Sequence, residues 1–158
     1  MAKFDAEVPR WVIEDCEKLY ANADELIGEM TRAGAQVVLD KIKVKCPQTI
    51  RNYARMSVTY KTPSDGAINT KVYWSGYIPF SNPNREYFTR AAKGRNYSTT
   101  KGVPASFLAI LYEYGRSDLP FPKHPSLRSA IGDRSAIEQA MFEAQQKGWE
   151  ILGINAGN

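Results

Sequence analysis

The chain has 158 residues, of which 43% are hydrophobic, and it carries a net charge of +4 at pH 7. This length favours a single domain, residues 1–158, able to bury about 70% of its unfolded surface. No apolar run approaches the roughly 18 residues of a membrane helix, and the N-terminus lacks the apolar core of a secretory signal. We therefore expect a cytosolic globular protein with no membrane partner.

Cysteine and histidine are scarce, which argues against metal and redox chemistry. Cys16 and Cys46 are the only cysteines, and no Cys-x-x-Cys spacing occurs. Unlinked thiols are the interpretation that a cytosolic chain favours, and a structural zinc site is not expected.

Motifs of the common enzyme classes are absent from the sequence. There is no phosphate-binding loop, dinucleotide-binding motif, zinc-protease motif or EF-hand. A hydrolytic triad needs a histidine beside a nucleophile, and the single histidine, His124, lies between prolines. The sequence therefore predicts no enzyme: no catalytic residue, no metal ligand and no cofactor.

Two helices are expected first, over residues 8–20 and 23–45, with one bent helix as the alternative. Asn22 and Glu25 form a capping box that predicts the start of the second helix, and Pro47 ends it. Apolar residues at helical spacing predict a stripe on the first helix: Val12, Ile13, Cys16, Leu19 and Tyr20. The buried face predicted for the second helix comprises Ile27, Met30, Gly34, Val37, Val38 and Ile42.

A β-hairpin is expected over residues 53–77. Residues 53–61 alternate between apolar and polar, with Met56, Val58 and Tyr60 on one face, and residues 68–77 alternate again. Asp65-Gly66 between them is a strong turn signal. A bare hairpin is marginal, so we expect further strand from residues 78–102 or from a neighbouring subunit.

Residues 78–102 form a basic insertion. They contain five basic residues and one acidic residue, Glu86, so the net charge of the segment is +4. The rest of the chain has 16 basic and 16 acidic residues, whose charges cancel. Interleaved aromatic residues suit nucleic acid, since arginines meet phosphates and rings stack on bases. A solvated insertion and an acidic protein partner are the alternatives. The candidate binding residues are Arg85, Arg90, Lys93, Arg95 and Lys101.

Residues 103–131 predict a helix over residues 104–114, a stop at Gly115, a proline-stiffened crossing and a second helix with Leu127 and Ile131 on its apolar face. Glu113 is a carboxylate in an apolar setting. We expect it to accept hydrogen bonds from the following turn or to pair with Arg116.

A last helix is expected over residues 136–147, ended by Gly148. The tail over residues 149–158 keeps apolar side chains that either fold back on the domain or dock on a neighbour. These residues are Trp149, Ile151, Leu152 and Ile154. The fold class is thus α+β: a small antiparallel sheet around a central hairpin, packed by a long N-terminal helix and two further helices.

Two short motifs in residues 103–131 resemble those of one protein family. The first is Glu113-Tyr114-Gly115, and the second comprises Pro125, Leu127, Arg128 and Ala130. Their order and spacing are similar to those of the small tail-component or head–tail joining proteins of tailed phages, the gene-product-ten-like family of HK-group phages. Residues 35–60 also fit, with a helix that closes in Lys45-Cys46-Pro47 before a strand.

The resemblance implies a structural protein of a phage virion or phage-tail-like particle. Such proteins form rings, commonly hexamers, that complete the tail and join it to the head. The implied partners are further copies of the chain, the tail-tube protein and head-completion or connector proteins, with DNA passing through the lumen. The implied location is the virion neck, and the host cytoplasm during assembly. The alternative is a small cytosolic nucleic-acid-binding protein that uses the basic insertion.

Overall fold

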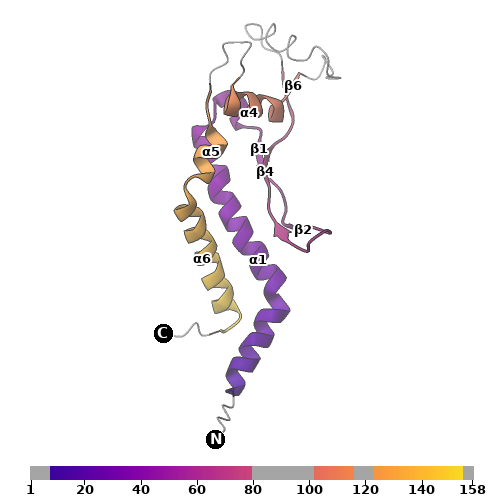
Figure 1. The fold of residues 1–158 in the computed structure, drawn as a ribbon, viewed down its shortest axis with the longest axis vertical. Helices are drawn as coiled ribbons and strands as arrows, with labels where there is room; N and C mark the ends of the chain where they lie inside the picture. The colour runs from indigo at the N-terminus through magenta and orange to yellow at the C-terminus, as the bar shows by residue number, and fades with distance from the viewer. Residues whose placement is uncertain (1–7, 80–101, 116–122, 155–158) are drawn as a thin grey trace, which may run out of the picture.

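The computed structural model describes residues 8–79, 102–115 and 123–154 (Figure 1). These residues mix helices with short antiparallel strand pairs, which confirms the α+β class. The helices are α1 (Arg10–Lys45), α2 (Gln48–Arg51), α4 (Ala105–Tyr114), α5 (Ser126–Ile131) and α6 (Arg134–Ile151). The strands are β1 (Ala54–Met56), β2 (Tyr60–Lys61), β3 (Ile68–Asn69), β4 (Val72–Trp74), β5 (Tyr77–Ile78) and β6 (Val103–Pro104).

α1 is one continuous helix of 36 residues, so the predicted start of a second helix at Asn22 is wrong. The Asn22 side-chain amide donates to the Lys18 carbonyl, 2.8 Å away, instead of capping a new helix. No proline or glycine lies between residues 20 and 23 to interrupt the hydrogen bonds. The end of the helix was predicted correctly, because Pro47 follows Cys46, which is extended.

The core lies between α1, the β1–β4 strand pair, α4 and α5. α1 contributes Leu39 and Ile42, and the largest fully buried side chains are Ile42, Ile50, Leu108 and Cys46. The sequence prediction missed Leu39 and wrongly included Ile27, which is exposed. Val37 is only half-buried, because it faces α6 rather than the core. α1 thus has two apolar faces with different partners.

The hairpin is split by a one-residue change of register. Met56 pairs with Val72, while Tyr60 pairs with Asn69, so four steps on one strand match three on the other. This is the geometry of a β-bulge, which turns the extra residue away from the ladder. The predicted continuous alternation is therefore wrong at Val58, which is 84% exposed.

Beside the bulge, the hairpin is tied to α1 through hydroxyl groups. The Thr70 hydroxyl lies 3.1 Å from that of Thr59 and 3.3 Å from that of Thr31 on α1.

A third strand pair holds the two ends of the basic insertion. Tyr77 pairs with Pro104, and Ile78 pairs with Val103. Gly102 has φ of 92°, and a Cβ atom there would lie 2.2 Å from the Ile78 carbonyl oxygen. Only glycine permits this close approach. We call this pair the β5–β6 clasp.

α6 runs antiparallel to α1 and packs along it (Figure 1). It passes through Gly148 and continues to Ile151, so the prediction that Gly148 ends the helix is wrong. The glycine has a packing reason: a Cβ atom on it would lie 2.2 Å from Leu26 Cδ1 of α1. Gly34 of α1 gives similar room to Met141, whose Cγ would lie 3.0 Å from an added Cβ.

Candidate functional site

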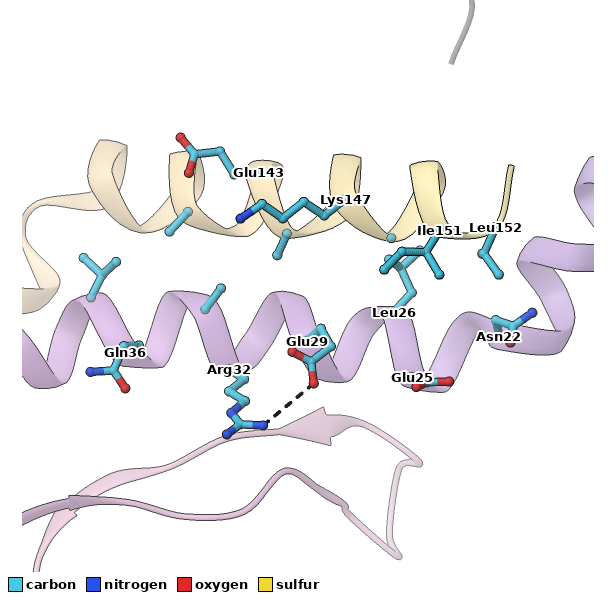
Figure 2. Close-up of a pocket in the computed structure, with 15 residues that line it drawn as sticks. Asn22, Glu25, Leu26, Glu29, Arg32, Gln36, Glu143, Lys147, Ile151 and Leu152 are labelled. Carbon is cyan, nitrogen blue, oxygen red and sulfur yellow. Dashed lines mark ion pairs between the residues drawn. The ribbon is translucent and has the colours of Figure 1, made fainter. Parts of the chain in front are cut away.

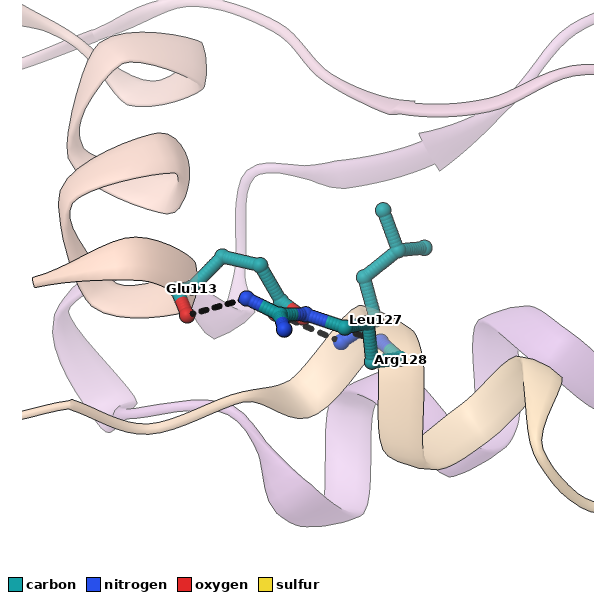
Figure 3. A network of polar contacts seen from close by, with 3 residues as sticks. All are labelled: Glu113, Leu127 and Arg128. Carbon is teal, nitrogen blue, oxygen red and sulfur yellow. Dashed lines mark hydrogen bonds and ion pairs between the residues drawn. The ribbon is translucent and has the colours of Figure 1, made fainter.

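Glu113 joins the two motifs that carried the family resemblance. It lies in the last turn of α4 with only 5% of its surface exposed. Its carboxylate accepts hydrogen bonds from the backbone N–H groups of Leu127 and Arg128, both at 3.0 Å (Figure 3). These N–H groups are in the first turn of α5, where a helix has no partners of its own for them. A side chain of α4 therefore caps α5.

The Arg128 side chain closes the same network. Its Nε donates to the Glu113 carboxylate at 3.1 Å, and its Nη2 donates to the Glu113 carbonyl at 3.3 Å. The guanidinium also lies 4.8 Å from the centre of the Tyr114 ring, in cation–π geometry. Because three N–H groups satisfy one buried carboxylate, its desolvation cost is offset.

The segment between the two motifs begins and ends at adjacent positions, because Gly115 lies beside Lys123. Gly115 has φ of 73°, and a Cβ atom on it would lie 2.8 Å from Lys123 Cγ. The His124 N–H donates to the Tyr112 carbonyl at 2.7 Å, and the two rings stand edge to face. Arg116, Pro120 and Pro122 of the crossing lie outside the described residues, so the predicted pairing of Glu113 with Arg116 stays a prediction.

The structure brings the family-motif residues into one joint between α4 and α5. Glu113, Tyr114 and Arg128 contact one another, Pro125 precedes α5 as its N-cap, and Ala130 is fully buried. Leu127 packs against the core. The contacts of the joint hold the end of α4 against the start of α5. The sequence predicted that Glu113 accepts hydrogen bonds from the turn that follows it, but the donors are the first backbone N–H groups of α5 and the Arg128 side chain.

A groove runs between α1 and α6, with a volume of about 810 Å³ (Figure 2). Its floor is lined by small and apolar side chains, including Ala33, Val37, Ala140 and Ala144. Charged residues stand along it, and Arg32 pairs with Glu29 at 3.9 Å. Sequence reasoning missed this groove, because it treated α1 as having one buried face.

The apolar residues of the predicted tail belong mostly to α6. Trp149 and Ile151 are in the helix, and Leu152 follows it directly. Trp149, Leu152 and Ile154 are half-buried, whereas Ile151 is 85% exposed at the end of the groove. Leu152 therefore lies beside α1 of its own domain, while Ile151 is left largely uncovered.

The first turns of α1 and the two residues before them, which we call the α1 arm (residues 8–23), expose large apolar side chains. Tyr20 is 87% exposed, and Val8, Trp11 and Ile13 are also exposed. The stripe predicted for this region is present, but the described part of the chain does not bury it.

The five basic residues of the insertion lie outside the described residues. The structure places only the ends of their segment, at the β5–β6 clasp. Whether Arg85, Arg90, Lys93, Arg95 and Lys101 meet DNA or protein stays a prediction.

Among the residues that the structure describes, two side chains have a pKa shifted from the usual value. The side-chain hydrogen bond and positive charge of Lys41 lower the pKa of Asp133, and this ion pair ties α1 to the start of α6. Burial raises the pKa of the Cys46 thiol, which the nearby Arg51 partly opposes. Cys16 is an exposed free thiol, and Cys46 is a buried one.

Within the described residues, no group of side chains is arranged to hold a metal ion. No helix in this part of the chain is long and apolar enough to cross a membrane. Comparison with family models, curated proteins and solved structures gave no match.

Proposed function

We propose that this protein is a structural component of a tailed phage or phage-tail-like particle. In this role, copies of the chain form a ring that completes the tail and joins it to the head. The partners are the tail-tube protein on one side and a head-completion or connector protein on the other.

The observation that carries the proposal is the Glu113–Arg128 joint. The resemblance rests on two motifs separated by the crossing, and in this chain their residues form one hydrogen-bonded unit. Two motifs that this chain shares with the phage family are stronger support for the proposal when their residues contact each other. A change in one motif alone would then lower the stability of the fold. The exposed apolar residues of the α1 arm and Ile151 suit a protein that works in an assembly.

Electron microscopy of the purified chain, alone and mixed with tail tubes, tests this function. In the mixture with tail tubes, we expect closed rings bound to one end of the tubes. A chain that forms no ring and binds no tube, at concentrations where the fold is intact, would overturn the proposal. The genes beside this one give an independent check, since portal, capsid and tail-tube genes are expected there.

The local charge of residues 78–102 supports a second candidate, a nucleic-acid-binding protein. In that case the isolated chain binds duplex DNA with an affinity that falls steeply as salt rises, because phosphate contacts release counterions. Ring formation without DNA affinity favours the first function, and salt-sensitive DNA binding without rings favours the second.

A further inference from the structure

The face of α1 that packs against α6 continues beyond the end of α6. Along this face, apolar and small residues repeat at alternating steps of four and three: Val12, Cys16, Leu19, Ala23, Leu26, Met30, Ala33 and Val37. This heptad spacing is typical of a helix packed lengthwise against another helix. We call this row the α1 seam. α6 packs along the second half of the seam, with Gly148 against Leu26.

The first half of the α1 seam lies on the α1 arm, which extends past the end of α6 (Figure 1). A shallow hollow of about 400 Å³ lies along one side of it and includes the seam residues Val12 and Cys16. Its lining comes from α1 and from Val8 just before it: Val8, Val12, Ile13, Cys16, Glu17 and Tyr20. No other element of the described chain contributes to this hollow. A helix with so continuous an apolar stripe normally buries it against a partner.

We propose that the α1 arm binds the α1 arm of a second copy of this chain, as an antiparallel helix pair centred between Cys16 and Leu19. In this register, Val12 faces Ala23 of the second copy, and Cys16 faces Leu19 of the second copy. Two-fold symmetry repeats each layer once. Each layer joins a larger side chain to a smaller one, which fills the space evenly. The arm is thus complementary to itself.

The antiparallel direction follows from the position of α6. Because α6 lies on this face from Leu26 onward, a parallel pair would place two α6 helices in the same space. In the antiparallel pair, the two domains lie at opposite ends. Ile13 then comes beside Tyr20 of the second copy on one flank of the seam. On the other flank, Asp15 comes beside Asn22 of the second copy, whose amide can donate to a carboxylate.

The same register brings the first turn of the second copy toward exposed residues of the first. Trp11 of the second copy reaches the part of α1 before Leu26, near the end of the groove where Ile151 is exposed. The contact is short, so its area lies near the lower limit of specific interfaces, about 1,200 Å² in total. We expect a reversible dimer with a dissociation constant on the order of micromolar.

This inference does not rest on the proposed function, since a two-fold contact joins two copies and by itself closes no ring. Its first test is sedimentation equilibrium of the reduced full-length chain. We expect a monomer–dimer equilibrium that Leu19→Asp weakens at least tenfold. Glu14→Gln, which lies on the opposite side of the arm, is the matched control and should leave the equilibrium unchanged. A wild-type chain that stays monomeric at a concentration about 100-fold above the expected dissociation constant would overturn the proposal. So would an assembly that Leu19→Asp does not weaken.

The second test measures the register by disulfide formation. In a Cys16→Ser background, Val12→Cys and Ala23→Cys together place the two new thiols opposite each other across the proposed interface. Within one chain, these positions are 11 residues apart on one helix, about 16 Å, so they cannot bond to each other. We expect a covalent dimer on mild oxidation of the double variant and little from Val12→Cys alone. Efficient crosslinking by Val12→Cys alone would show a parallel pair, and no crosslinking by either variant would show no pairing at this seam. Each of these two results contradicts the proposal.

Discussion

Gly148 of α6 lies so close to Leu26 of α1 that a Cβ atom built on the glycine would stand 2.2 Å from Leu26 Cδ1. A glycine inside a helix costs roughly 1 kcal/mol relative to alanine. Here the cost is offset, because the missing side chain lets the two helices approach at the end of their contact. Gly34, which faces Met141, serves the same purpose further along the pair.

The first prediction concerns this contact. Gly148→Val should lower the free energy of unfolding by about 1–3 kcal/mol, since the added atoms force α6 away from Leu26. Gln146→Ala, on an exposed part of the same helix, is the control and should change stability by less than about 0.5 kcal/mol. Urea unfolding followed by circular dichroism measures both. A Gly148→Val chain as stable as the control would mean that α6 does not pack on α1 at this point.

The second prediction separates the two faces of α1. Leu39 is 6% exposed in the core, whereas Val37 is half-buried beside the α1–α6 groove. Leu39→Ala should cost about 2–5 kcal/mol, because it leaves a cavity in packed surroundings. Val37→Ala should cost less than half as much, since solvent can reach its site. Equal losses in thermal unfolding experiments would contradict the assignment of the two faces.

The sequence was enough to predict the fold class and the elements whose ends are set by proline. Pro47 marks the end of α1, and the apolar repeat before Gly115 marks α4. It was not enough for features that depend on a partner element. Gly148 is a helix stop by local rules and an interhelical contact in the structure. The bulge beside Val58 depends on the register with the opposite strand, which a two-residue period does not contain.

The candidate site, like the fold, could be predicted only in part from the sequence. The acidic side chain in an apolar turn was recognisable, and Glu113 does accept backbone hydrogen bonds. Its ion pair with Arg128 was not recognised, because the two residues are 15 positions apart across the crossing. Exposure on the α1 arm was missed for a different reason. Helical spacing shows that a face is apolar, but not whether the same chain covers it.

The third prediction tests the Glu113 network. Glu113→Gln keeps the shape of the side chain but presents an amide where three N–H groups need acceptors. We expect a loss of about 2–3 kcal/mol, because buried donors are left without partners. Arg128→Ala should cost less, since the carboxylate keeps both backbone donors. The double variant should show a coupling of at least about 0.5 kcal/mol in a mutant cycle. Strictly additive losses would mean that the two side chains do not interact in solution.

The fourth prediction is a pH dependence. Burial raises the pKa of Cys46 above its usual value of 9.0, so the unfolded chain loses the thiol proton at lower pH than the folded chain. Below pH 9 both states keep the proton and the group has no effect on stability. Above that pH, the free energy of unfolding should fall by up to about 1.4 kcal/mol per pH unit from this group. The comparison is with Cys46→Ala, whose stability should fall less steeply between pH 9 and the raised pKa. Identical slopes in the two proteins would be inconsistent with a buried thiol.

The fifth prediction concerns the basic insertion. Changing Arg90, Lys93 and Arg95 together to Glu should leave the melting temperature within a few degrees of the original, because the β5–β6 clasp holds the ends of the segment. Joining of tails to heads, or DNA passage, should be impaired, since the local charge changes sign. Infectivity of particles assembled with the variant is the measurement, and a Lys-for-Arg version of the same variant is the control. Full infectivity of the Glu variant would rule out a role for this charge.

The β5–β6 clasp also has a practical consequence for engineering. Because Ile78 pairs with Val103 across two strands, the segment between them begins and ends at adjacent positions. The entropic cost of closing a segment with fixed ends grows only with the logarithm of its length, by about 0.6 kcal/mol for each doubling. A fluorescent domain or an affinity tag inserted between the clasp strands therefore adds only a small further entropy cost to folding.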